Sequence, residues 1–121
     1  MARTILVADD SPIIRRMLCQ IFEKEEEYDL CAEASNGQEA IDLAIKHRPE
    51  LIILDHSMPV MNGVNAAREL KKIMPTVPII LFTNYADLAH NLFPNGSSVD
   101  RVIAKDDASQ LMHHIRELIS A

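Results

Sequence analysis

The sequence has no tryptophan, only three glycines and only two cysteines in 121 residues. Three glycines cannot supply a Gly-rich phosphate loop, and neither GxGxxG nor GxxxxGK[ST] occurs, which excludes the usual dinucleotide and P-loop nucleotide sites. Cys19 and Cys31 do not make the cysteine framework of a disulfide-stapled secreted domain. We therefore expect a cytoplasmic protein with both thiols in or near the core.

Long apolar runs and an excess of basic residues are also missing. No apolar run approaches the ~20 residues that cross a bilayer, and the short run before Asp9 is not a signal peptide. The net charge is −6, with three phenylalanines and two tyrosines. This balance lacks the positive surface and the stacking aromatics of a nucleic-acid binder. We expect no membrane partner and no direct nucleic-acid contact.

The chain alternates short apolar runs with helical patterns. At 48% hydrophobic and 25% charged residues, it has the composition and length of one globular domain, residues 1–121. Continuous apolar runs predict buried strands, and the polar–apolar alternation of 28–34 predicts an edge strand. The buried strands are expected at 5–8, 51–54, 78–82 and 102–104.

Helical spacing separates the strands. Ser11 and Pro12 begin the first helix as N-cap and first helical residue. The others are expected after Asn36–Gly37, over 64–74, over 85–93, and from Asp106 or Asp107 onward. A strand and a helix repeated five times predict a doubly wound α/β fold, with a parallel sheet covered on both faces.

Polar residues gather where the predicted strands end. Asp9 and Asp10 follow the first strand, Asp55 follows the third, Thr83 ends the fourth and Lys105 follows the fifth. Ligands of open α/β sheets bind at the carboxyl ends of the strands. Three close carboxylates need a cation, and oxygen ligands suit Mg²⁺. One carboxylate is a candidate nucleophile toward phosphorus. The bland alternative, that each is an ordinary turn or cap residue, weakens when five complementary groups share one edge.

The same residues resemble a known family. The stretches 5–11, 52–63, 81–83 and 102–105 resemble response-regulator receiver domains, the phosphoacceptor modules of two-component signalling. The most specific match is D-x-x-M-P-x-M-N-G over Asp55–Gly63. The resemblance covers essentially the whole chain and implies the flavodoxin-like strand order 2-1-3-4-5.

The resemblance also implies roles for these residues. Asp55 is the expected phosphoacceptor, phosphorylated by a sensor histidine kinase or a phosphotransfer protein. The expected contacts of the phosphoryl group are Thr83 and Lys105. The expected Mg²⁺ ligands are Asp10, Asp55 and the backbone carbonyl of Ser57, with Asp9 acting through a water. Phosphorylation would then switch a protein–protein surface toward a downstream output domain or protein. Self-catalysed phosphoryl transfer and autodephosphorylation are the only chemistry expected, so the chain is not an enzyme acting on external substrates.

Four departures from the family pattern motivate an alternative. Asp106 stands where a proline usually follows the lysine, Val102 replaces an aromatic residue, and Asn84 replaces a small one. The Pro94–Ser98 stretch replaces the second half of the fourth helix. The alternative is a pseudo-receiver, a binding module that works without phosphorylation. If the domain does switch, we expect it to use the 84–98 segment rather than Val102, with little dimerisation.

Two weaker hypotheses concern the neighbours of Asp55. A haloacid-dehalogenase-like phosphatase would carry a second aspartate where Ser57 stands, so that class has no support. His56 is interpreted as a plain exposed side chain, with a place at the rim of the site as the minority alternative.

Overall fold

Five parallel strands form the single sheet of the structure, a computed structural model that describes residues 2–84 and 98–119. The strands are β1 (Arg3–Ala8), β2 (Tyr28–Ala34), β3 (Leu51–Leu54), β4 (Ile79–Thr83) and β5 (Arg101–Ala104). Their order is β2-β1-β3-β4-β5, and every neighbouring pair is parallel. This confirms the predicted fold class, the strand order and the position of 28–34 at an edge.

Three helices begin at side-chain caps, of which Ser11 was predicted. They are α1 (Pro12–Glu23), α2 (Gly37–His47) and α3 (Gly63–Ile73). Ser11 Oγ accepts from the Ile14 amide at 3.3 Å, Asn36 Oδ1 from Glu39 at 2.8 Å, and Asn62 Oδ1 from Asn65 at 2.8 Å. Each cap satisfies an amide that has no partner within its helix. The helix expected over 85–93 lies outside the described residues.

The start expected for the last helix is wrong. A 3₁₀ helix, η1 (Lys105–Gln110), comes first, and α5 covers Leu111–Leu118. Asp107 has φ −114° and ψ 38°, which is not helical. Aspartate carboxylates compete for nearby backbone donors and favour turns over helix interiors. The α-helix therefore begins only at Leu111, where the chain regains a buried face.

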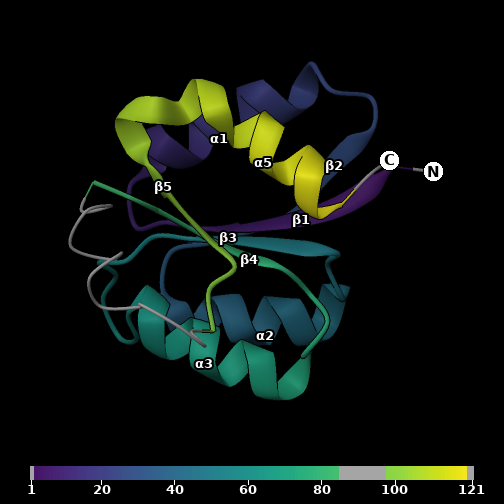
Figure 1. Ribbon diagram of the computed structural model, residues 1–121. Helices are drawn as coiled ribbons and strands as arrows, with labels where there is room; N and C mark the ends of the chain where they lie inside the picture. The colour runs from purple at the N-terminus through teal and green to yellow at the C-terminus, as the bar shows by residue number, and fades with distance from the viewer. Residues whose placement is uncertain (1, 85–97, 120–121) are drawn as a thin grey trace.

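Different helices cover the two faces of the sheet, as Figure 1 shows, with α1 and α5 on one side and α2 and α3 on the other. Each face buries its own hydrophobic core. Successive strand residues point to opposite faces. In β1, Ile5 and Val7 therefore pack toward α1 and α5, whereas Leu6 and Ala8 pack toward α2 and α3. Continuous apolar runs are required because both faces are dry. None of the helices within 2–84 and 98–119 is long and apolar enough to cross a membrane.

Candidate functional site

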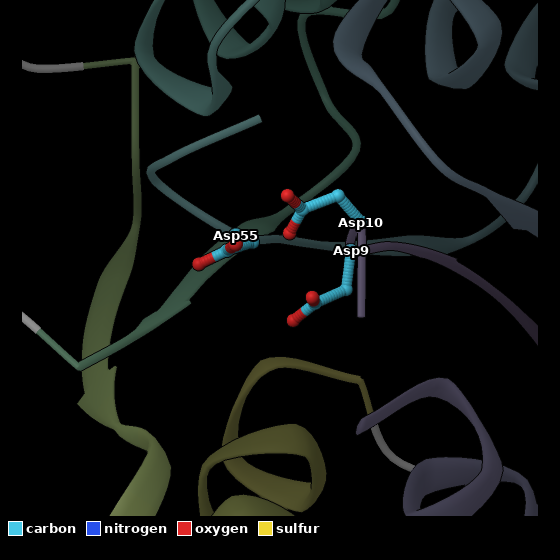
Figure 2. Close-up of side chains that lie close together, drawn as sticks. All are labelled: Asp9, Asp10 and Asp55. Atoms are coloured by element: carbon cyan, nitrogen blue, oxygen red, sulfur yellow. The ribbon is translucent and has the colours of Figure 1, made fainter. Parts of the chain in front are cut away.

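Three carboxylates meet at the carboxyl edge of the sheet. Oxygens of Asp9, Asp10 and Asp55 all lie within 4.8 Å of one another. Figure 2 shows the side chains converging from two chain segments, the turn after β1 and the end of β3. Asp9 and Asp55 are 2% and 5% exposed, whereas Asp10 is exposed. The cluster therefore consists of two buried carboxylates, Asp9 and Asp55, and one solvent-exposed carboxylate, Asp10.

Hydrogen bonds beyond the strand ladders hold the turn that follows β1 and the end of β3. The Asp55 amide donates to the Ala8 carbonyl at 2.9 Å, and the Asp9 amide donates to the Ala34 carbonyl at 3.0 Å. The Ser11 amide then donates to Asp9 Oδ1 at 2.9 Å. The central strands β1 and β3 thus deliver the carboxylates to one place, because parallel neighbours end at the same edge.

Lys105 reaches this site from the end of β5. Its Nζ lies 2.8 Å from Asp9 Oδ2 and 3.2 Å from Asp55 Oδ1. The lysine side chain is 10% exposed, so the two ion pairs are little screened by solvent. Asp106, in place of the family's usual proline, does not keep Lys105 away from Asp55.

Burial and charge pairing shift the pKa values of Asp55 and Lys105 in opposite directions. Burial, and next the neighbouring Asp9 carboxylate, raise the pKa of Asp55 above its ordinary value, although Lys105 pulls it down. Burial lowers the pKa of Lys105, but its hydrogen bond to Asp9 and the charge of Asp55 outweigh that and raise it overall. One ammonium among three carboxylates leaves the site acidic.

Thr83 and the loop after Asp55 complete the surroundings. Thr83 is fully buried at the end of β4, and its register partner in β5 is Ala104, the residue before Lys105. Ser57 is exposed and lines, with Asp10, His56 and Asn62, an open hollow of about 540 Å³. All five predicted side chains therefore belong to one end of the sheet, and the backbone of Ser57 lies in the adjoining loop.

Three residues near the site were missed or misread from the sequence. His56 is half-buried and lines the hollow beside Asp10, so its interpretation as a plain exposed side chain is wrong. Gly63 donates its amide to the His56 carbonyl at 3.0 Å, and a Cβ there would lie 2.0 Å from the Asp55 carbonyl oxygen. Arg15 donates from Nη1 to the Asp9 carbonyl at 2.6 Å. The final glycine of the Asp55–Gly63 motif was a usable signal, but nothing in the sequence pointed to Arg15.

The donor set has a definite chemical capacity. Its oxygen ligands, without sulfur or imidazole in the cluster, suit a hard divalent cation such as Mg²⁺. A desolvated carboxylate beside an ammonium suits nucleophilic attack on a phosphoryl group whose charge the cations neutralise.

Comparison with known proteins points to one family. The family model described as response regulator receiver domain matches residues 5–116. The chain is 41% identical, over 83 residues, to the transcriptional regulatory protein PdtaR of Mycobacterium tuberculosis, covering 67% of this chain and 40% of that protein. It is 39% identical, over 84 residues, to a protein-glutamate methylesterase/protein-glutamine glutaminase of Hahella chejuensis, covering 69% of this chain and 21% of that protein. The chain thus spans well under half the length of these curated relatives.

Solved structures share the fold. The response regulator TrrA of Thermotoga maritima, in complex with Mg²⁺-BeF, superposes with a TM-score of 0.85 at 30% identity, covering 97% of this chain and 99% of that one. The response regulator domain of Thermotoga maritima CheB superposes with a TM-score of 0.86 at 24% identity, covering 100% and 98%.

Proposed function

The chain belongs to the response regulator receiver domain family, and on that premise we propose that Asp55 accepts a phosphoryl group from a sensor histidine kinase or phosphotransfer protein. Residues 1–121 then act as one receiver domain whose phosphorylation alters a surface read by an output domain or protein. The observation that carries the proposal is the meeting of three carboxylates within 4.8 Å, with Lys105 Nζ 3.2 Å from Asp55.

The residues fit a divalent cation unequally. Both oxygens of Asp9 already accept hydrogen bonds, Oδ1 from the Ser11 amide and Oδ2 from Lys105. Asp10 and Asp55 are therefore the better direct ligands, together with the Ser57 carbonyl, and Asp9 acts through a water. When bound, Mg²⁺ supplies positive charge that neutralises the phosphoryl oxygens. TrrA, whose structure was solved with Mg²⁺-BeF, offers a precedent at 30% identity.

The chain's own groups supply the rest of the chemistry. An Asp55 oxygen forms the new O–P bond while the P–N bond of the donor phosphohistidine breaks; the imidazole nitrogen keeps the electron pair and takes up a proton. Lys105 pairs with the phosphoryl oxygens, and the Thr83 hydroxyl is the candidate hydrogen-bond donor to them.

The pseudo-receiver alternative gains no support from the geometry. Lys105 contacts Asp55 despite Asp106, and Asn84 is exposed. The methylesterase activity named for one relative belongs to a protein of which this chain matches 21%, so it is no guide to this domain.

Phosphorylation of the purified chain tests the proposal. Acetyl phosphate with MgCl₂ should add one phosphoryl group by intact mass, removed by mild base as an acyl phosphate must be. The label should be absent with EDTA and absent in Asp55→Asn, while Asp29→Asn, which alters an exposed aspartate of β2, should label normally. Label on Asp55→Asn would move the acceptor elsewhere, and an unlabelled wild type would favour the pseudo-receiver.

A further inference from the structure

Arg15 of α1 contacts the main chain of the acidic turn after β1. Its Nη1 donates to the backbone carbonyl of Asp9 at 2.6 Å, and its Nε lies 3.5 Å from Glu33 Oε1 on β2. The arginine side chain is 22% exposed and the glutamate 41%. A charged donor at this distance to a carbonyl makes a strong hydrogen bond.

The carbonyl that Arg15 holds belongs to the peptide that joins Asp9 to Asp10. The amide and both carboxylate oxygens of Asp9 are held by Ala34, Ser11 and Lys105, so the carbonyl is the remaining polar group of that residue. The rotation of this peptide sets the direction in which the Asp10 side chain leaves the chain. Because Asp10 is exposed, packing does little to fix it.

Glu33 orients the guanidinium from the neighbouring strand. Glu33 directly precedes Ala34, whose carbonyl accepts the Asp9 amide. The main chain of Asp9 is therefore hydrogen-bonded both to β2 and, through Arg15, to α1. The other Glu33 oxygen accepts from the Cys19 thiol at 3.3 Å. Burial, and next the bond to Glu33, raise the pKa of Cys19 to about 11, so the thiol remains a donor at neutral pH.

We propose that Arg15, oriented by Glu33, is a positioning residue that fixes the Asp9–Asp10 peptide and thereby raises the affinity of the acidic cluster for Mg²⁺. The inference rests on the proposed function for its metal, but not for its geometry. Partners beyond the ligands themselves alter metal affinity by ~10–100-fold in other sites. A planar guanidinium serves both the carbonyl and the carboxylate, whereas a lysine ammonium on a flexible stem holds them less well.

The test combines a metal-free and a metal-dependent measurement. In the apo protein, the ¹⁵N shift of the Asp10 amide reports the peptide whose carbonyl Arg15 holds. Arg15→Ala should move it strongly, Arg15→Lys less, and Arg16→Ala, at the exposed neighbouring position, little. Calorimetric Mg²⁺ titration, at a temperature where circular dichroism shows every variant folded, should give about tenfold weaker binding for Arg15→Ala. Arg15→Lys should recover part of that loss, and Arg16→Ala should bind like wild type.

Glu33→Gln tests the orienting carboxylate. It should weaken Mg²⁺ binding in the wild-type background but add nothing in the Arg15→Ala background. Asp29→Asn makes the same charge change on β2 and should leave Mg²⁺ binding unchanged from its parent in either background.

Each outcome decides a different claim. If Arg15→Ala binds Mg²⁺ as tightly as wild type does, the positioning role is overturned and the proposed function stands. An Asp10 amide that does not move in Arg15→Ala overturns the positioning geometry whatever the metal does. A wild type that binds no Mg²⁺ overturns the metal role in the proposed function, and with it the effect claimed for Arg15.

Discussion

Lys105 is the single described cation in ion-pair contact with the acidic cluster, within residues 2–84 and 98–119. Its ammonium touches two buried carboxylates from different strands, so it compensates charge and also ties β5 to β1 and β3. Removing one partner of a buried pair leaves an uncompensated charge, which costs more than the pair contributes.

Lys105→Ala should therefore lower the free energy of unfolding by about 3 kcal/mol in EDTA. Millimolar MgCl₂ should recover part of this loss, because a divalent ion can replace the missing positive charge. Urea unfolding with and without Mg²⁺ measures both effects. Lys72→Ala, which removes an exposed pair with Glu69, should cost less than about 1 kcal/mol. Equal losses in the two variants would contradict the special place of Lys105.

Asp55 makes the site pH-sensitive in a stated direction. Its pKa is raised in the folded protein by burial and then by Asp9, so the native state holds the Asp55 proton more tightly than the unfolded chain. That stabilisation is complete below the ordinary value of 3.8 and is lost as pH rises through the raised pKa. Ionised Asp55 is thus a cost to stability at neutral pH.

Asp55→Asn should melt higher than wild type at pH 7 in EDTA, by the few degrees that about 1 kcal/mol produces. The difference should shrink as pH falls toward 4, where wild-type Asp55 becomes protonated. Melting curves from pH 4 to 8 test the trend, with Asp29→Asn as the control for a general charge effect. A difference that is constant with pH would show that Asp55 is not the group responsible.

Among the elements, the start of α3 is built against the site. Gly63 lies so close to the end of β3 that a Cβ would meet the Asp55 carbonyl oxygen at 2.0 Å. The glycine is therefore required by close approach, and the loop from Asp55 to Asn62 returns the chain to the strand it left. The main chain of Asp55 and the first residue of α3 are therefore in close contact.

Gly63→Ala should destabilise the protein by about 3 kcal/mol, because backbone atoms cannot give way as a flexible side chain can. It should also slow labelling by acetyl phosphate, since Asp55 must move to relieve the contact. Asn65→Ala, an exposed change in the same helix, should leave both measurements near wild type. A Gly63→Ala protein with wild-type stability would refute the close contact.

Boundaries of elements were predictable where capping chemistry marks them. Ser11, Asn36 and Asn62 each precede a helix and accept from its first turn. The helix α1 begins as expected, and α2 and α3 each begin one residue earlier than expected. The entry to α5 was not predictable in this way. Asp106 and Asp107 look like an N-terminal cap in sequence, but the chain makes a 3₁₀ turn there.

For the whole molecule, strand–helix alternation was enough to predict a parallel sheet, but not its order. Alternation permits several windings, and the order 2-1-3-4-5 came from the resemblance around Asp55. The convergence of Asp9, Asp55 and Lys105 follows from that order. The Arg15 contact does not, because its acceptor is a main-chain carbonyl, which any residue carries and no sequence pattern marks.

Val102 affects how a signal can leave the site. It lies in β5, two residues before the register partner of Thr83, and packs half-buried against the core shared with α2 and α3. A β-branched side chain has few rotamers and no ring to turn between two positions. Any switch that starts at Thr83 therefore cannot pass through an aromatic flip at this position.

We expect the switch to use the segment 84–98 itself. We also expect little phosphorylation-driven dimerisation through the helix predicted over 85–93 and the last helix, α5. That segment lies outside the described residues apart from its ends, and its sequence carries Pro94 and Gly96, which suit a rebuilt connection. Hydrogen exchange with and without beryllofluoride and Mg²⁺ should show its largest change between Asn84 and Ser98, and sedimentation should give a monomer in both states. The Asp55→Asn protein, given the same additives, provides the baseline. Changes confined to the turns around Asp10 and Asp55, or a shift to dimer, would contradict this prediction, because phosphorylation would then alter a surface other than the segment 84–98.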